Sequence, residues 1–168
     1  LQYSEKEVQE MFDLFYKDIF IQLARLGELE AVVVCENEND HLNGNVYAKY
    51  TSKDAAYTAC QTLNTLWYGG KPVYAELSPV DSFHDAICRS HETNSCSRGD
   101  HCNFIHIRRP SGAVKSALFR SQEKSVLQKR LEQVLAQQKE QKAVQEYDTS
   151  VEQAPPPTQL VGAPCGVA

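Results

Sequence analysis

No stretch of this 168-residue sequence stays apolar for the ~20 residues that a membrane-spanning helix needs. No secretory signal pattern opens it, so we expect a reducing compartment in which its six cysteines do not form a disulfide framework. Two catalytic zinc signatures are also missing, H-E-x-x-H and H-x-E followed by P-C-x-x-C. These absences argue against a membrane partner, a disulfide-stapled secreted domain and a zinc enzyme.

Three cysteines and one histidine lie close together, with the spacing C-x7-C-x5-C-x3-H. Three thiolates and an imidazole fill the tetrahedral shell of Zn²⁺ and leave no open position, which is typical of a structural site. Few large apolar residues surround them, so we expect zinc bound by Cys88, Cys96, Cys102 and His106 to supply much of the local folding free energy. The alternative is buried or disulfide-paired cysteines, with His106 on the surface.

The net charge of -5 is unevenly distributed. Residues 1–83 carry 13 acids and 6 bases, a net charge of -7, and residues 84–130 carry 4 acids and 9 bases, a net charge of +5. Residues 131–168 carry 5 acids and 2 bases, a net charge of -3. The basic middle part is therefore the candidate for contact with a polyanion.

Hydrophobic periodicity predicts the secondary structure of the N-terminal part. Ser4 and Glu7 form a capping box, and the pattern predicts helices at 4–26 and 53–64 and strands at 29–35, 44–50 and 72–77. This α+β order matches an RNA-recognition-motif-like sandwich without its first strand. We expect residues upstream of Leu1 to supply that strand, so that the sequence is a fragment.

A helix of some 30 residues is expected to begin near Ser111, after Pro110. Its apolar stripe is incomplete, which favours a solvated or partner-dependent helix. The residues from Tyr147 onward lack periodicity and are expected to be disordered. The expected domains are a sheet domain (1–83), a zinc finger (84–110), a helical extension (111–146) and a disordered tail (147–168).

Residues 5–110 resemble the small subunit of the U2 snRNP auxiliary factor. The stretches that carry this resemblance are Gly27–Glu30, Val34–Asn37, Asp40–Tyr47, Leu63–Asn64, Trp67–Tyr68, Pro72–Val80 and Cys102–His106. In that family a zinc finger, a U2-auxiliary-factor homology motif (a modified RNA-recognition fold), a second zinc finger and a variable tail follow one another. The resemblance implies a non-enzymatic nuclear subunit of the spliceosome that acts in mRNA splicing at the pre-mRNA 3′ splice site, with the large subunit and other splicing proteins as partners.

The resemblance also implies how the large subunit is bound. A family loop with the sequence Arg-x-Phe, together with two helices, holds a partner tryptophan, and the loop's own tryptophan packs against partner prolines. The matching loop here is Leu66-Trp67-Tyr68, in which Leu66 replaces the arginine. The alternative for Trp67 is a half-buried core aromatic. The first helix adds acids for basic partner residues: Glu10, Asp13 and Asp18.

RNA contact is expected at the finger rather than at the sheet. The strand that would carry stacking aromatics has Asn43 and Asn45 at two consensus positions and retains only Tyr47. In fingers of this kind short loops expose aromatic faces, here Phe104 and His91, and cations meet phosphates. The expected cations are Arg89, Arg98, Arg108 and Arg109. Two alternatives stay open: Phe104 as a core plug of the finger, and a protein-interaction adaptor whose finger is only structural.

Overall fold

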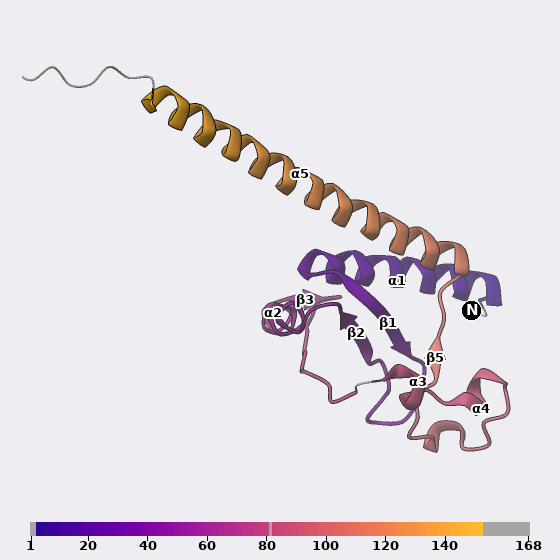
Figure 1. The fold of residues 1–168 in the computed structure, drawn as a ribbon. Helices are drawn as coiled ribbons and strands as arrows, with labels where there is room; N and C mark the ends of the chain where they lie inside the picture. The colour runs from indigo at the N-terminus through magenta and orange to yellow at the C-terminus, as the bar shows by residue number, and fades with distance from the viewer. Residues whose placement is uncertain (1–2, 81, 153–168) are drawn as a thin grey trace, which may run out of the picture. The chain divides into compact units, whose positions relative to one another are not determined.

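The computed structural model describes residues 3–80 and 82–152. Along the chain in Figure 1 lie α1 (Glu5–Leu26), β1 (Leu29–Cys35), β2 (Val46–Tyr50), α2 (Lys53–Leu63), β3 (Trp67–Tyr68), β4 (Lys71–Pro72), α3 (Phe83–Ala86), α4 (Arg89–Glu92), β5 (Ile107–Arg108) and α5 (Gly112–Glu152). The chain divides into two compact units at Leu127, within α5. Within the described ranges, no helix combines the length and the apolar character needed to cross a membrane.

The α+β class and the two N-terminal helices are confirmed. The Ser4 hydroxyl accepts a hydrogen bond from the Glu7 N–H, and the Glu7 carboxylate accepts one from the Ser4 N–H, so the predicted capping box starts α1. The Ser52 hydroxyl caps α2 by accepting a hydrogen bond from the Ala55 N–H. Strands β1 and β2 pair antiparallel, with Val33 opposite Tyr47.

The third strand of the sheet comes from an unexpected place. The sheet order is β2-β1-β5, and β5 pairs antiparallel with the end of β1, Val34 opposite Arg108 and Cys35 opposite Ile107. Figure 1 shows β5 beside the end of β1. A strand near the C-terminal end of the finger segment, directly after His106, therefore completes one edge of the sheet.

The prediction of a strand at residues 72–77 is wrong. Pro72 ends the two-residue strand β4, which pairs only with β3 in a short hairpin. Beyond it, the Asn64 side chain takes the place of a strand partner, since its amide accepts from the Ala75 N–H at 3.0 Å and donates to the Ala75 carbonyl at 2.8 Å. The backbone of this segment is thus bonded to the end of α2 instead of to a sheet.

Both faces of β1 are buried, each by a different cluster. On one face Tyr16 and Phe20 of α1 pack against Val32 and Val34. On the other face Val33 and Cys35 pack with Leu42 and with residues that belong to the finger segment, Ile87, Ile105 and Ile107 among them. The finger is therefore seated on the sheet face opposite α1.

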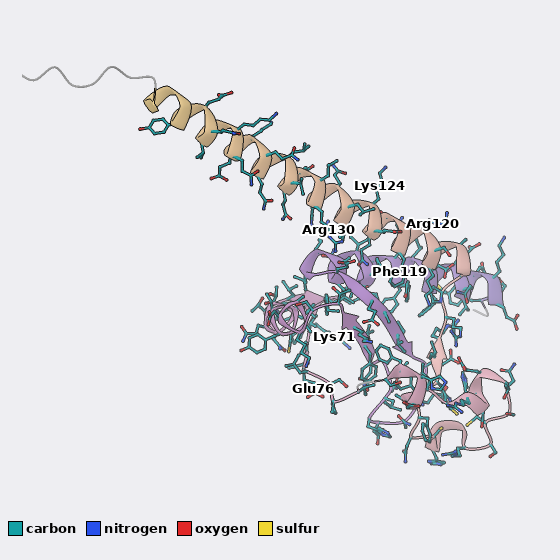
Figure 2. All side chains as sticks on the ribbon, viewed as in Figure 1. Lys71, Glu76, Phe119, Arg120, Lys124 and Arg130 are labelled. Atoms are coloured by element: carbon teal, nitrogen blue, oxygen red, sulfur yellow. The ribbon has the colours of Figure 1, made fainter. Side chains whose placement is uncertain are left out.

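The first turns of α5 are part of the core, which corrects the expectation of a solvated helix. The Phe119 ring lies edge-to-face against Phe20 with centroids 4.9 Å apart, and Figure 2 shows Phe119 between α5 and α1. The Gln122 amide donates to the Leu29 carbonyl and accepts from the Leu29 N–H, both at 2.9 Å. These two hydrogen bonds tie α5 to Leu29, the first residue of β1.

Helix α5 is also longer than predicted, because it continues past Tyr147 to Glu152. The remainder of the expected disordered tail, residues 153–168, lies outside the described residues. The apolar side chains in the second half of α5 are exposed, as the sequence indicated: Leu127, Leu131, Val134, Leu135 and Val144.

Candidate functional site

The four predicted zinc ligands meet at one point. Cys88 precedes α4, Cys96 lies in the following loop, Cys102 follows a single 3-10 turn and His106 precedes β5. Their ligand atoms all lie within 4.8 Å of one another, and all but the half-buried Cys96 are buried. Within the described residues, this is the one such group of metal-ligating side chains.

The spacing of the sulfur atoms fits zinc. In a tetrahedral shell with Zn–S bonds of about 2.3 Å, two sulfurs lie roughly 3.8 Å apart. The Sγ atoms of Cys88 and Cys102 are 3.8 Å apart. The donor set and this sulfur–sulfur distance therefore fit a closed structural site, whose metal contributes folding free energy when bound.

Backbone N–H groups point at two of the sulfurs. A hydrogen bond from the N–H of Arg98 lowers the pKa of Cys96. Burial raises the pKa of the Cys102 thiol, and an N–H donated by Phe104 opposes that shift. Such donors stabilise the thiolate, the form of cysteine that binds a metal.

Asn37 supports the metal centre from the sheet, a role that sequence reasoning missed. Its side chain is only 3% exposed. The amide accepts from the His106 N–H at 2.8 Å and donates to the carbonyls of Phe104 at 3.0 Å and Cys102 at 3.4 Å. Asn39 adds a bond to the Cys102 carbonyl at 2.7 Å. The connection after β1 therefore holds the backbone between two ligands.

Replacing Asn37 with alanine is expected to destabilise the finger by about 2–4 kcal/mol, because buried backbone groups lose their partners. Loss of a residue that orients ligands should also weaken zinc affinity, by roughly 10–100-fold. Urea unfolding and competition with a chromophoric zinc chelator measure the two effects. The matched control is Asn45→Ala, since Asn45 is exposed and its side-chain amide donates to the His41 carbonyl, away from the metal ligands. Equal zinc affinity in both variants would contradict this role for Asn37.

Three of the predicted RNA-contacting residues share one hollow. Phe104 is 41% exposed, so it is not a core plug of the finger. The Arg98 guanidinium lies over its ring, 5.4 Å from the centroid. Arg89 lies on the same hollow, a cavity of about 280 Å³ that His84 and Ser90 also line.

The other predicted RNA-contacting residues already have partners within the chain. His91 stacks on the ligand His106, with ring centroids 4.0 Å apart, and its Nε2 lies 3.1 Å from a Glu36 carboxylate oxygen. Arg108 lies over the Phe12 ring and 4.0 Å from Glu36. The remaining arginine, Arg109, pairs with Glu92. Phe104, Arg98 and Arg89 therefore line an open hollow. The other three residues contact acidic side chains of the chain itself, Glu36 or Glu92.

The predicted partner loop is the β3–β4 hairpin, and it lies against α1. Trp67 is 70% exposed, which excludes the half-buried alternative, and Leu66 is exposed as well. The Tyr68 ring meets Phe15 edge-to-face at 6.1 Å. Burial raises the pKa of Tyr68, as does the hydrogen bond between its hydroxyl and Asp18. Tyr68 thus anchors the hairpin to α1, and Trp67 stays in solvent.

An exposed apolar stripe on α1 extends this surface and was not predicted. Met11, Leu14 and Ile21 are exposed, and together with Asp18 they recur at intervals of three and four residues. The hydrophobic pattern predicted the helix but not which of its apolar side chains stay exposed. The 3-4-3 spacing was the signal that could have found them.

All three acids proposed for a partner have partners inside the chain, since Asp18 bonds to the Tyr68 hydroxyl. Glu10 lies 3.8 Å from Lys6 in an exposed pair. Asp13 accepts from the Ser111 N–H at 2.8 Å and from the Gln9 side chain at 3.0 Å, so its carboxylate serves the junction with α5. A contact of Asp13 with a partner protein stays a prediction.

Comparison with known proteins decides the relationship. The family model described as zinc finger C-x8-C-x5-C-x3-H type (and similar) matches residues 85–108, although the first spacing here is one residue shorter. Over 122 residues, 73% of this chain, the sequence is 46% identical to the splicing factor U2AF 23 kDa subunit of Schizosaccharomyces pombe. It is 43% identical to the splicing factor U2af 38 kDa subunit of Drosophila melanogaster over 69% of the chain. The chain is a homologue of the U2AF small subunits.

A third relative has a different name. The transcriptional regulator of yeast form adherence 2 of Candida albicans is 44% identical over 134 residues, 79% of this chain. The chain spans 36% of that protein, 56% of the S. pombe protein and 44% of the Drosophila protein.

The U2AF small-subunit homologue carries a CCCH zinc finger whose Cys3His cluster implies zinc. Its U2AF relatives are splicing factors by name.

Proposed function

We propose that the U2AF small-subunit homologue binds pre-mRNA at the 3′ splice site through its zinc finger, as a subunit of a nuclear splicing complex. The observation that carries this proposal is the open hollow around Phe104, with Arg98 over the ring and Arg89 beside it. An exposed aromatic face stacks on an unpaired base, and neighbouring guanidinium groups contact its phosphates.

The sheet supports RNA binding at the finger, because the sheet face that would stack on bases is covered by other parts of the chain. The retained aromatic, Tyr47, lies edge-to-face against Phe83 with ring centroids 6.3 Å apart. The finger segment covers the neighbouring residues of β1, and the N-terminal part of the chain is acidic. A base has no stacking platform there, and the phosphates would meet like charge.

RNA titration tests the proposal. Phe104→Ala is expected to weaken binding of a short single-stranded RNA by about 1–3 kcal/mol, the usual effect of losing one stacking aromatic. Arg98→Ala should reduce the slope of log affinity against log salt by roughly 1. Fluorescence anisotropy at several salt concentrations measures both.

The control is Tyr74→Ala, because Tyr74 is 88% exposed and lies outside the finger. RNA affinity that is the same in Phe104→Ala and in the unchanged protein would contradict the stacking role. No measurable RNA binding in any variant would favour the adaptor, in which the finger only buttresses the sheet domain.

We further propose that the large U2AF subunit binds across α1 and the β3–β4 hairpin. The exposed side chains there are Trp67 and Leu66 on the hairpin and the stripe of Met11, Leu14 and Ile21 on α1. Asp18 lies within this stripe and supplies a negative charge for a basic partner residue. Several large apolar side chains exposed next to one another are typical of a protein–protein contact.

The same reasoning supports a finer description of the fold. We propose that α1, β1, β2 and α2 correspond to a U2-auxiliary-factor homology motif, the modified RNA-recognition sandwich. Its remaining central strand would lie beside β2, which is an edge of the sheet among the described residues. The free edge of Val46–Tyr50 is the place where such a strand would pair.

A further inference from the structure

The segment that joins the finger to α5 carries two arginines before a serine: Arg108-Arg109-Pro110-Ser111. Residues 109–111 belong to no helix or strand, because β5 ends at Arg108 and α5 begins at Gly112. The Arg109 side chain is 59% exposed and Ser111 is half-buried. The serine therefore lies in a short irregular linker at the surface.

Ser111 takes part in a small polar cluster that joins this linker to α1, which we call the clasp: Gln9, Asp13, Arg109 and Ser111. The Asp13 carboxylate accepts from the Ser111 N–H at 2.8 Å, and the Ser111 hydroxyl also bonds to it. Gln9 donates to Asp13 at 3.0 Å and to the Arg109 carbonyl at 3.2 Å. The carboxylate of Asp13 thus bonds to the residue that directly precedes α5, close to the N-terminus of that helix.

We infer that Ser111 is a phosphorylation site for an arginine-directed protein kinase, and that its phosphate opens the clasp. Kinases select substrates partly by charge pattern. Arginines three and two residues before the serine suit an acidic substrate groove. In the reaction the Ser111 Oγ attacks the γ-phosphorus of ATP, the bond to the β-phosphate oxygen breaks, ADP leaves and the hydroxyl proton passes to the kinase base.

The contacts of the clasp determine what the phosphate does. It replaces the hydroxyl donor to Asp13 with a group carrying about -1.5 to -2 charges, directly beside the carboxylate. Like charges at hydrogen-bond distance repel, so Asp13 is displaced. The phosphate can itself cap α5, since anions are favoured at a helix N-terminus. Helix α5 therefore stays helical while its polar contact with α1 is lost.

Phosphorylation of the full zinc-bound chain by the catalytic subunit of cAMP-dependent kinase with ATP tests the assignment. Peptide mapping by mass spectrometry should place most of the phosphate on Ser111, and Ser111→Ala should lower incorporation at least tenfold. The matched control is Ser121→Ala, because Ser121 is preceded by one arginine, Arg120, and should incorporate as much as the unchanged chain. Equal incorporation in Ser111→Ala and the unchanged chain would overturn the assignment.

Hydrogen exchange tests the second half of the inference. Amide exchange at Ser111, whose N–H donates to Asp13, should rise at least tenfold after phosphorylation, while exchange at Val33 in the sheet should not change. In Asp13→Asn, which keeps an acceptor and removes the charge, the rise should be several-fold smaller. Unchanged exchange in fully phosphorylated protein, or an equal rise in Asp13→Asn, would overturn the opening of the clasp by charge repulsion.

Discussion

Replacing Cys102 with serine is expected to abolish zinc binding and to unfold the segment from Cys88 to His106. The Cys102 side chain is fully buried, and its sulfur lies 3.8 Å from that of Cys88. Structural zinc contributes roughly 10–16 kcal/mol of apparent binding free energy in zinc-finger peptides near neutral pH. Few apolar contacts in this segment could replace that stabilisation. Metal analysis after dialysis should therefore find almost no zinc in Cys102→Ser.

The control is Cys60→Ser, because Cys60 is half-buried in α2 and lies outside the cluster. This variant should keep one equivalent of zinc. The Cys102 variant should also show faster exchange of the Glu36 amide, which donates to the His106 carbonyl at 2.8 Å. A full equivalent of zinc in Cys102→Ser would contradict the four-ligand site.

Replacing Trp67 with alanine is expected to weaken binding of the large subunit's proline-rich segment by about 2 kcal/mol or more, roughly 30-fold. The ring is 70% exposed in the isolated chain, on a hairpin that Tyr68 anchors to Phe15. An exposed aromatic on a fixed hairpin loses little conformational freedom on binding. The expected loss is the same at low and high salt, since an apolar ring carries no charge. Isothermal titration calorimetry measures it.

Leu66→Arg provides the complementary measurement, because it restores the cation that this loop lacks relative to the family. It should change the affinity in a salt-dependent manner. The exposed aromatic control is Tyr74→Ala, which should bind as tightly as the unchanged protein. Unaltered affinity in Trp67→Ala would mean that the partner is met elsewhere on the molecule.

Features that depend on neighbours in sequence were predictable from the sequence. The capping box at Ser4 and Glu7 and the spacing of the four metal ligands involve residues close in the chain, and the structure has both where they were expected. Features that depend on distant partners were not predictable. The segment after Pro72 has a strand-like composition, yet Asn64 bonds to its backbone instead.

Polar side chains were the least predictable part of the site. Nothing in the sequence marks Asn37, within a polar connection, as a buried support of the metal centre. Asp13 and Asp18 are equivalent acids on one helix, but only Asp13 faces the linker before α5. The role of each depends on which backbone groups the folded chain brings within hydrogen-bond distance.

The late position of β5 affects how the protein folds as it leaves the ribosome. Asn37 and His106 are 69 residues apart, and at 5–20 residues per second about 3–14 s pass between their synthesis. During that interval β1 has β2 as a neighbour, but its other edge and the side chains of Val33 and Cys35 lie open to water and to other nascent chains. We therefore expect chaperone binding during translation, and the supply of zinc once His106 has been made, to change how much of the new chain reaches the native state.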